Sequence, residues 1–540
     1  MSRTTAASAP ASPPTRTPGR LLGSATFIMV GNLASRVLGL VREQVIAGFY
    51  GVGLEASAFS AAARVPSMLY DLLIGGMLSA AVVPVLSAYA ADPERRAELW
   101  RVVSVFLTMV TLVTGLASVA VFALAAPLAG ALAQGFGADG TALVATYLRV
   151  IAPSIMLFGV TGAVIGVLYA REQFGPPSVA IAVYNLGLIT SVLVFHDRLG
   201  GLALPLGITL GSLLQLCVLW PGLRGGHVRP RLEAGHPALR RILTLYAPIG
   251  AGLAVSQLQV IADTRFSSAA GEAALASMRY ATTLRELPHG LISVAISLAI
   301  LPALAAAHAR REAQTYDRTL ARGLRLVLAL IVPATVGLAV LADPVVGLVF
   351  QRRLFGDEAR QLVTAALYAY LIGLPFIGID WPLNYAFYAR QNTRVPALIG
   401  VVSVGVYLVF AVALGPALNL ARLPQRWVFL GLVLADSLKH VAHAGVMLVL
   451  ARRLIGREAL AGVGRTALAT AAAAAVMGAA VLGLDRWLAG AVGHGTLAWG
   501  LRAAAGAAVG AAVYLPLAAR LDVGEIGWLA GVVRARVARR

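Results

Sequence analysis

The chain has 540 residues, of which 59% are hydrophobic and only 13% are charged. Soluble domains contain about 45–50% apolar and about 25% charged residues. With a mean hydropathy of +0.80, this composition excludes a soluble protein and predicts a polytopic membrane protein.

The net charge of +20 comes from 43 arginines and one lysine, Lys439. These charges separate apolar segments, which favours membrane topology and contacts with anionic lipids over nucleic-acid binding. The single Cys217 offers no disulfide framework and no cysteine metal site.

Fourteen apolar stretches are long enough to cross a bilayer, because a spanning helix needs about 20 such residues. They cover 21–48, 58–90, 103–133, 142–169, 178–197, 201–221, 241–266, 275–306, 322–350, 361–388, 396–415, 427–451, 465–484 and 496–519. Residues 1–20 are expected to form a disordered cytoplasmic tail, and residues 520–540 a basic one. The sequence therefore predicts an all-α protein with about 14 transmembrane helices.

The distribution of arginines indicates the orientation. With both termini inside the cell, the inner tails and loops hold 27 arginines, the outer loops hold seven, and nine lie within spans. Cytoplasmic loops of membrane proteins carry such an excess of basic residues. We therefore expect both termini on the cytoplasmic side.

The chain repeats itself at an offset near 218 residues. YAREQFGPP at 169–177 matches YARQNTRVP at 388–396, and two further matches, which begin at residues 79 and 126, follow the same offset in the same order. The matches predict two homologous six-helix lobes, 21–221 and 222–451, the second opening with a cytoplasmic linker at 222–240. The two spans within 452–519 stand outside the repeat. Two such lobes around a central cavity are typical of transporters, in which access alternates between the two sides.

Arginines inside the first two spans of each lobe form the candidate substrate site. A charge at the bilayer centre costs about 2.5–3.5 kcal/mol, so such residues normally face a cavity or a partner. The arginines in these spans are Arg36, Arg42, Arg64, Arg265, Arg279 and Arg285, and all but Arg279 are taken as substrate-binding residues. Their convergence would suit a multiply charged anion such as a phosphate or pyrophosphate. For any one of them, snorkelling to the interface or local pairing is the alternative.

Other polar residues accompany these arginines. Gly39 and Glu43 share a helix face with Arg36, and Glu43 is expected to orient or balance the arginines near the mouth of the cavity. Span 7 carries a polar stripe that predicts a cavity wall or a contact between lobes; it consists of Gly252, Ser256, Gln259 and Asp263. Asp263 and Asp380 are candidate ion-coupling residues, with pairing to a nearby arginine as the alternative for Asp263.

Span 12 concentrates charge in the segment DSLKHVAH. Asp436, Lys439, His440 and His443 lie on one helix face. A structural seam, in which Asp436 pairs with His440 and Lys439 with His443, is the favoured interpretation; a proton relay and a metal site are the alternatives. The sequence has no HExxH, P-loop, GxSxG or paired-aspartate motif, so we expect no enzymatic activity and no cofactor.

Several segments resemble the MurJ (MviN) family of bacterial lipid II flippases. They are SRVLGLVRE at 35–43, RVPSMLYDLL at 64–73, GGMLSAAVVPVLSAY at 75–89, AVSQLQVIADTRFSS at 254–268, RYATTLRELPHGLISVAISLAILPAL at 279–304, LF at 354–355 and FYARQNTRVP at 387–396. The resemblance covers about residues 21–450. It implies the fold of the MOP exporter superfamily, with fourteen helices and two lobes around a V-shaped cavity in the bacterial plasma membrane.

The implied activity is movement of the undecaprenyl-pyrophosphoryl peptidoglycan precursor from the inner to the outer leaflet. In the family, cavity arginines hold the pyrophosphate, and Na⁺, H⁺ or the membrane potential drives the cycle. The implied partners are this precursor, anionic lipids and the cell-wall synthesis machinery. A flippase for another polyprenyl-linked glycan and a transport-inactive scaffold are the alternatives; the basic cavity disfavours a multidrug antiporter.

The family's motifs carry over at particular residues. Arg36 and Arg42 match its two arginines in span 1, Arg64 matches a basic position in span 2, and Glu286 lies in the span-8 motif. Two departures lie in span 8, where Thr282 and Thr283 replace Asp and Arg, and two in span 2, where Ser57 replaces an acid and an Arg is missing near Tyr70 and Asp71. Arg265 or Arg285 is expected to supply the charge missing from span 8.

Overall fold

The computed structural model describes residues 18–72, 81–233, 235–420, 424–493, 495–521, 523–525 and 527. Within these ranges the chain forms helices and no strands. The first half contains α1 (Pro18–Tyr50), α2 (Leu54–Tyr70), α3 (Val83–Ala90), α4 (Arg96–Ala123), α5 (Ala125–Ala133), α6 (Gly137–Ala170), α7 (Gly175–Leu199) and α8 (Ala203–Leu219). The predicted tails, 1–20 and 520–540, lie largely outside the described residues.

The second half continues with ten α-helices and a π-helical turn, η7 (His289–Val294). The helices are α9 (Pro237–Ala269), α10 (Ala274–Pro288), α11 (Ala295–Ala309), α12 (Ala313–Val340), α13 (Ala342–Phe350), α14 (Asp357–Ala389), α15 (Arg394–Leu420), α16 (Leu430–Leu454), α17 (Val463–Val492) and α18 (Thr496–Arg520). Short 3₁₀ turns are η3 (Pro93–Arg95), η4 (Gln134–Phe136), η5 (Gly200–Leu202), η6 (Trp220–Leu223), η8 (Gln425–Trp427) and η9 (Glu458–Leu460).

The predicted all-α membrane fold is confirmed, whereas the count of fourteen spans stays a prediction. Among the described residues, ten helical stretches are long and apolar enough to cross a membrane, and the bent pair Pro237–Ala247 and Gly252–Ala269 would be an eleventh. Two predicted spans, 178–197 and 201–221, fall within the single stretch Gly175–Leu223. Predicted span 58–90 includes 73–80, which lie outside the described residues.

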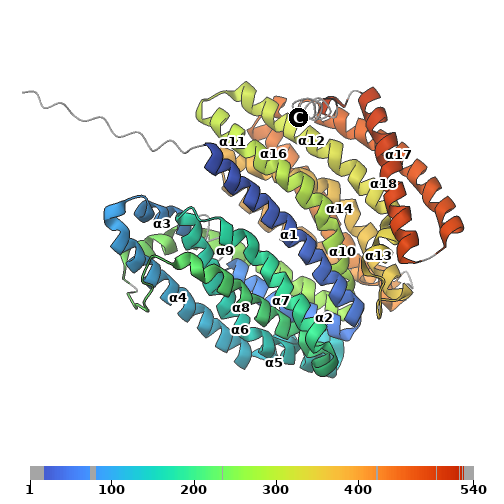
Figure 1. Cartoon of the computed structure of the whole chain (residues 1–540). Coiled ribbons are helices and arrows are strands. Elements are labelled where there is room, and N and C mark those ends of the chain that lie inside the picture. Colours follow the sequence, from blue (N-terminus) through green and yellow to red (C-terminus); the bar gives the residue numbers. More distant parts are fainter. Residues whose placement is uncertain are drawn as a thin grey trace, which may run out of the picture.

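The helices form two groups with α1 between them (Figure 1). Helices α2 to α8 lie on one side and α10 to α18 on the other. Helix α1 packs along α7 and also contacts α2, α10 and α13, while α9 reaches both α5 and α15. Helices α17 and α18 pack against each other and α17 packs on α12, outside the paired lobes.

Small residues allow a close helix contact between α7 and α8. A Cβ at Gly187 would lie 2.6 Å from the Cα of Gly211, a distance at which real atoms overlap. Membrane helices approach this closely through small residues because lipid tails provide no hydrophobic force between helices.

The YAR segments of the repeat have the same structure in both lobes. The Arg171 Nη1 donates to the carbonyl of Gly222 at 2.8 Å, and the Arg390 Nη1 donates to that of Leu454 at 2.7 Å. The residue after each arginine has a left-handed backbone, with φ of 60° at Glu172 and 57° at Gln391. Such angles are uncommon for residues other than glycine, so the two turns share a specific geometry.

The linker between the lobes lies along α4. The Ser104 hydroxyl accepts from the Arg229 amide at 3.2 Å, and the Thr108 hydroxyl accepts from the Arg231 amide at 3.0 Å. Farther along, Glu233 pairs with Arg101 at 2.9 Å, and the hydrogen bond from this guanidinium lowers the pKa of the Glu233 carboxyl. The linker is therefore fixed to the first lobe up to residue 233.

The two lobes meet at the end of α1 that carries Tyr50. The Leu354 amide donates to the Gly48 carbonyl at 3.1 Å, and the Tyr280 hydroxyl donates to the Gly51 carbonyl at 3.0 Å. The Ala276 amide donates to the Ser57 hydroxyl at 3.2 Å. These contacts close the molecule at this end.

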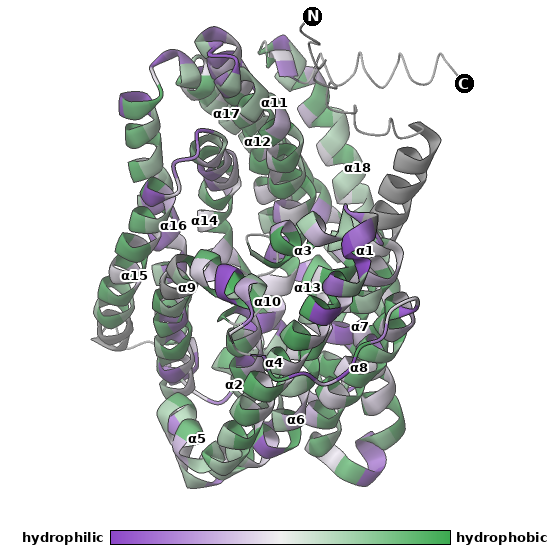
Figure 2. Cartoon of the chain, turned by 90° about the vertical axis from the view of Figure 1, so that its left-hand side faces the viewer, coloured by the Kyte–Doolittle hydropathy of each residue, from purple (hydrophilic) through white to green (hydrophobic). Residues whose placement is uncertain are grey.

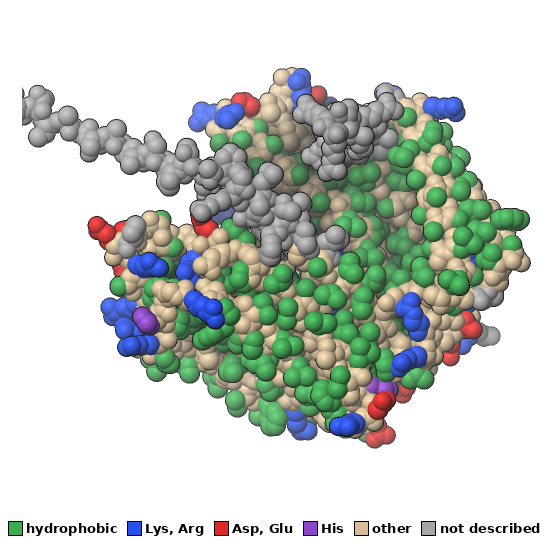
Figure 3. Space-filling model, in the orientation of Figure 1, with side chains coloured by type: hydrophobic (Ala, Val, Ile, Leu, Met, Phe, Trp, Pro, Cys, Tyr) green, Lys and Arg blue, Asp and Glu red, His purple; other side chains and the backbone are tan. Residues whose placement is uncertain are grey.

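The surface has the pattern of a membrane protein. Hydrophobic residues dominate the helices, and hydrophilic ones concentrate in the connections and between the helix groups (Figure 2). Hydrophobic side chains cover the middle of the face in Figure 3, while most charged side chains lie toward its edges. The helices are thus apolar outside, and their interior polar groups define the site.

Candidate functional site

A cavity of about 480 Å³ lies between α1, α2 and α10, with α6, α7 and α8 completing its wall. Four arginines line it: Arg36, Arg42, Arg64 and Arg279. Glu43 and Glu286 are the acids among the described lining residues, so the lining carries a formal charge of +2. A cavity with this surplus attracts anions.

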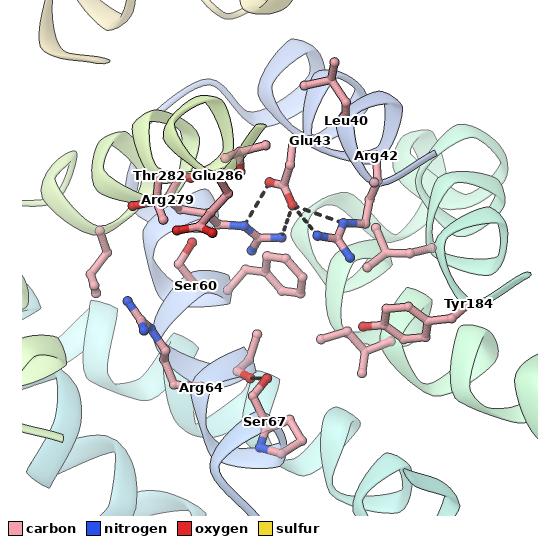
Figure 4. A pocket seen from close by; sticks show the side chains of 18 of the residues that line it. Leu40, Arg42, Glu43, Ser60, Arg64, Ser67, Tyr184, Arg279, Thr282 and Glu286 are labelled. Atoms are coloured by element: carbon pink, nitrogen blue, oxygen red, sulfur yellow. Dashed lines mark hydrogen bonds and ion pairs between the residues drawn. The ribbon is translucent and has the colours of Figure 1, made fainter. Parts of the chain in front are cut away.

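Glu43 is the centre of the arginine cluster (Figure 4). Its side chain is 1% exposed, and its Oε1 accepts from the Nη2 atoms of Arg42 at 2.6 Å and Arg279 at 2.9 Å. Arg42 also donates to the Asn185 Oδ1 at 2.8 Å, and the guanidinium of Arg279 lies 4.8 Å from the centre of the Phe59 ring. One carboxylate therefore orients two guanidiniums without neutralising both.

Arg64 reaches the cavity from α2, opposite Glu43 (Figure 4). Its Nη2 lies 3.4 Å from an oxygen of Asp263 on α9, whose other oxygen accepts from the Tyr407 hydroxyl at 2.6 Å. The alternative of an arginine partner for Asp263 is therefore the arrangement found. This contact joins α2 of the first lobe to α9 and α15.

Arg36 lies against the π-helical turn η7. A Cβ at Gly290 would lie 2.2 Å from the Arg36 Nη1, so only a glycine admits the guanidinium in this position. π-helical turns are rare and often occur at functional sites. Gly39, one turn along α1, also lines the cavity.

Thr282, Thr283 and Glu286 line the cavity from α10. The charge that the span-8 motif lacks is supplied by Arg279, one turn before the threonines. Arg279 is one of the converging arginines, although the substrate-binding set predicted from the sequence does not include it. Its signal was helical spacing, because it precedes Thr282, Thr283 and Glu286 by three, four and seven positions and so shares their face.

The arginines expected to compensate lie elsewhere. Arg265 donates to the Ala131 carbonyl at 3.5 Å and to the Gln134 side chain at 3.0 Å. Arg285 donates to Asp436 at 2.9 Å and to Glu286 at 3.2 Å. Neither lines the cavity, and neither do Ser256, Gln259, Asp263 and Asp380, as far as the described lining extends.

A second polar cluster lies in the other lobe, between α14 and α16. The Lys439 Nζ donates to the Asp436 Oδ1 at 2.7 Å, and the other oxygen of Asp436 accepts from Arg285. His440 and His443 face Asp380, with their Nδ1 atoms 3.8 Å and 2.9 Å from its Oδ2. The His440 Nε2 also lies 3.9 Å from the Oδ1 of Asp436, its predicted partner. The predicted pairing of Lys439 with His443 is therefore not the arrangement found.

Comparison with known proteins agrees with this geometry. A family model described as lipid II flippase MurJ matches residues 46–501. The chain belongs to the MurJ family. A relative in this family, the lipid II flippase MurJ of Burkholderia cenocepacia, is 30% identical over 379 residues, which are 68% of this chain and 73% of that protein. The probable lipid II flippase MurJ of Vibrio cholerae is 32% identical over 399 residues, 71% of this chain and 75% of that protein.

Solved structures show the MurJ fold over nearly the whole chain. A lipid II flippase MurJ in an inward closed conformation has a TM-score of 0.76 at 19% identity, covering 91% of this chain and 97% of that one. A multidrug resistance MATE transporter of the MOP superfamily in an inward-facing conformation has a TM-score of 0.61 at 14% identity, covering 77% of this chain and 94% of that one. The expected MOP fold is thereby confirmed.

Proposed function

We propose that this MurJ-family chain moves a pyrophosphate-linked lipid, the lipid-linked peptidoglycan precursor lipid II, from the inner to the outer leaflet of the bacterial plasma membrane. The observation that carries the proposal is the cavity with four arginines and two glutamates. Guanidiniums bind phosphate oxygens through paired hydrogen bonds. The names of the relatives point to the same substrate.

Preorganisation by Glu43 suits this role. Because Glu43 and Asn185 already hold Arg42, and Glu43 also holds Arg279, the guanidiniums lose little conformational freedom when an anion arrives. A pyrophosphate then meets two fixed cations, and Arg64 contributes from the opposite wall. Thr283, whose hydroxyl donates to the Arg279 carbonyl at 3.0 Å, lines the cavity beside them.

The contacts at the Tyr50 end support alternating access. With both termini in the cytoplasm, as the arginine bias favours, this closed end faces outward and the cavity is reached from the cytoplasmic side. Opening the contacts among Gly48, Gly51, Tyr280 and Leu354 would release the lipid to the outer leaflet. The cycle would be driven by Na⁺, H⁺ or the membrane potential.

Other partners follow from the same proposal. Anionic headgroups would interact with the arginine-rich cytoplasmic loops, and the machinery of cell-wall synthesis would consume the translocated precursor. The cavity contains no constellation that suggests catalysis, as judged from the described residues, and the chain would act as a transporter without a resident cofactor.

Complementation tests this function. A bacterium depleted of its own lipid II flippase would receive the wild-type protein, Arg36→Ala or Arg265→Ala. We expect the wild type and Arg265→Ala to restore growth and Arg36→Ala to fail, because Arg36 lines the cavity and Arg265 does not. Rescue by all three would rule out the arginine site. Failure of a well-inserted wild type would point to another polyprenyl-linked glycan or a scaffold role.

A further inference from the structure

The cluster around Asp380 differs from every other buried carboxylate group described above. Asp380 is 5% exposed within α14, and both nearby histidines, His440 and His443, approach the same oxygen, Oδ2. The other oxygen, Oδ1, is buried and has no hydrogen-bond partner among the described residues. His443 lies 2.9 Å from Oδ2, yet its Nδ1 is not aligned for a hydrogen bond.

The permanently charged cations of this region bind a different carboxylate, Asp436. Lys439 and Arg285 both bind Asp436, at 2.7 Å and 2.9 Å. Asp263 is held by Arg64 and Tyr407. Among the described residues, the basic side chains within 4 Å of the Asp380 carboxylate are therefore the imidazoles of His440 and His443. A buried carboxylate without a permanent partner is costly, and one proton added to the cluster removes its net negative charge.

Among the elements packed on α14, which also include α11, α12, α13 and α15, the charged groups around Asp380 come from α16, α10 and η7. They are His440, His443, Asp436 and Lys439 on α16, Arg285 on α10 and His289 on η7. His289 is buried, its Nδ1 lacks a hydrogen-bond partner in the described part of the chain, and its ring lies 5.7 Å from that of Trp381, next to Asp380.

His289 also connects the cluster with the cavity. It is the first residue of η7 and follows Glu286, which lines the cavity, by three positions. Its neighbour Gly290 lies directly against the Arg36 guanidinium. The titratable side chains of Glu286 and His289 thus belong to elements that lie between the cavity and α14, which carries Asp380.

We propose that Asp380, His440 and His443 form a proton-binding site, loaded from the cavity through Glu286 and His289, that couples proton movement to transport. The proposal rests on the proposed flippase function for its coupling role but not for its proton binding. Loading transfers one proton from cavity water to the shared carboxylate–imidazole group, and unloading returns it to water. The turn η7, whose Gly290 lies against the Arg36 guanidinium, connects this change of charge to the substrate site.

A fully satisfied structural seam would look different. In such a seam each buried polar atom would have a hydrogen-bond partner. Asp380 Oδ1, His443 Nδ1 and His289 Nδ1 have no hydrogen-bond partner within the described ranges. A metal site fits no better, because no group of three or more His, Cys, Asp or Glu residues suitable for a metal is found there.

Infrared titration of the purified full-length protein tests proton binding without any substrate. Difference spectra between about pH 5 and about pH 8 should show a protonated carboxyl band in the wild type. The band should be lost in Asp380→Asn, shifted in His443→Gln and unchanged in Asp139→Asn, an exposed acid on α6. A wild type without such a band, or a band that survives in Asp380→Asn, would overturn the proposal.

Proteoliposomes test the coupling. With the membrane potential clamped by valinomycin and potassium, a pH gradient should change the rate of lipid II flipping by the wild type at least about fivefold. His443→Gln should flip at one rate with or without the gradient, whereas His227→Gln, at an exposed position in the linker, should behave like the wild type. Flipping by the wild type that responds to Na⁺ but not to pH would refute coupling and leave the flippase function intact. No flipping at all would refute the function, and the infrared result would still decide proton binding.

Discussion

Two buried arginine sites in this protein differ in how their charges balance. Between α17 and α18, Arg502 is 5% exposed and makes two parallel hydrogen bonds of 2.8 Å to Asp485. In the cavity, the single carboxylate of Glu43 binds both Arg42 and Arg279. The first site is a neutral pair closed to other ligands; the second has one more cation than anion and faces a cavity.

The difference separates architectural charges from functional ones. A one-to-one pair satisfies the helices that carry it and leaves nothing for a ligand. A cluster with surplus positive charge is stable only if water or an anion shares the cavity. Hydropathy identifies both kinds as expensive residues within a membrane, and only their partners tell them apart. The following variants test this distinction.

The largest loss of stability is expected for Asp485→Asn. It leaves the buried Arg502 guanidinium without a carboxylate, which typically costs about 3–5 kcal/mol. Thermal denaturation in detergent would measure the loss against Asp139→Asn, an exposed control. Replacing both partners, Asp485→Leu with Arg502→Met, should recover most of it, and flipping per folded molecule should stay at the wild-type level. An unstable double variant would contradict the architectural role.

The next largest losses of stability are expected for Arg390→Ala and Arg171→Ala. The two losses should be equal in size. Each removes a charged hydrogen bond to a helix-end carbonyl, worth about 1.5–3 kcal/mol. Denaturation midpoints of the two variants would provide the comparison. A loss in one lobe only would show that the repeated turns differ in function.

Arg279→Ala should reduce flipping at least about tenfold, or about 1.4 kcal/mol, with a smaller effect on stability because Arg42 still pairs with Glu43. Adding Thr283→Arg returns a guanidinium to the same face of α10, at the position where the family motif has one, and should restore flipping. Reconstituted vesicles containing lipid II would report both rates. If the single variant flips normally, Arg279 has no role in the substrate site.

The smallest effect is expected for Gly290→Ala. The new methyl group displaces the flexible end of Arg36, so stability should change by less than about 1 kcal/mol, while flipping should fall by less than about tenfold. Gly252→Ala has open space around its Cβ and is the matched control. Equal flipping by the two variants would show that the position of Arg36 against η7 is unimportant.

Hydropathy predicted most of the fold, because every spanning segment must be helical and apolar. Charges within apolar spans also predicted that Arg36, Arg42, Glu43 and Arg64 face a cavity, and all four line one. The prediction that Arg265 lines the cavity was wrong. On a helix, two residues that are two positions apart, such as Asp263 and Arg265, point about 200° away from each other. Arg265 therefore faces the α5 end of the first lobe, whereas Asp263 faces Arg64.

The contact between Asp380 and the two histidines could not be predicted. Helical spacing grouped His440 and His443 correctly on one face of α16, but their partner lies on α14, some sixty residues earlier. Which helix faces which, and in what register, depends on tertiary packing. The same limit applies to Gly290, whose role is evident only once Arg36 is seen against it.

The attachment of the linker to α4 limits how the lobes can swing. The chain is anchored at Glu233 by Arg101, and α9 begins at Pro237, capped by the side chain of His236. Only four residue steps separate the two anchors, and fully extended they reach about 13–14 Å. The linker therefore restrains the start of α9, which moves with the first lobe. A wide opening of the cytoplasmic mouth then requires the rest of the second lobe to rotate about α9.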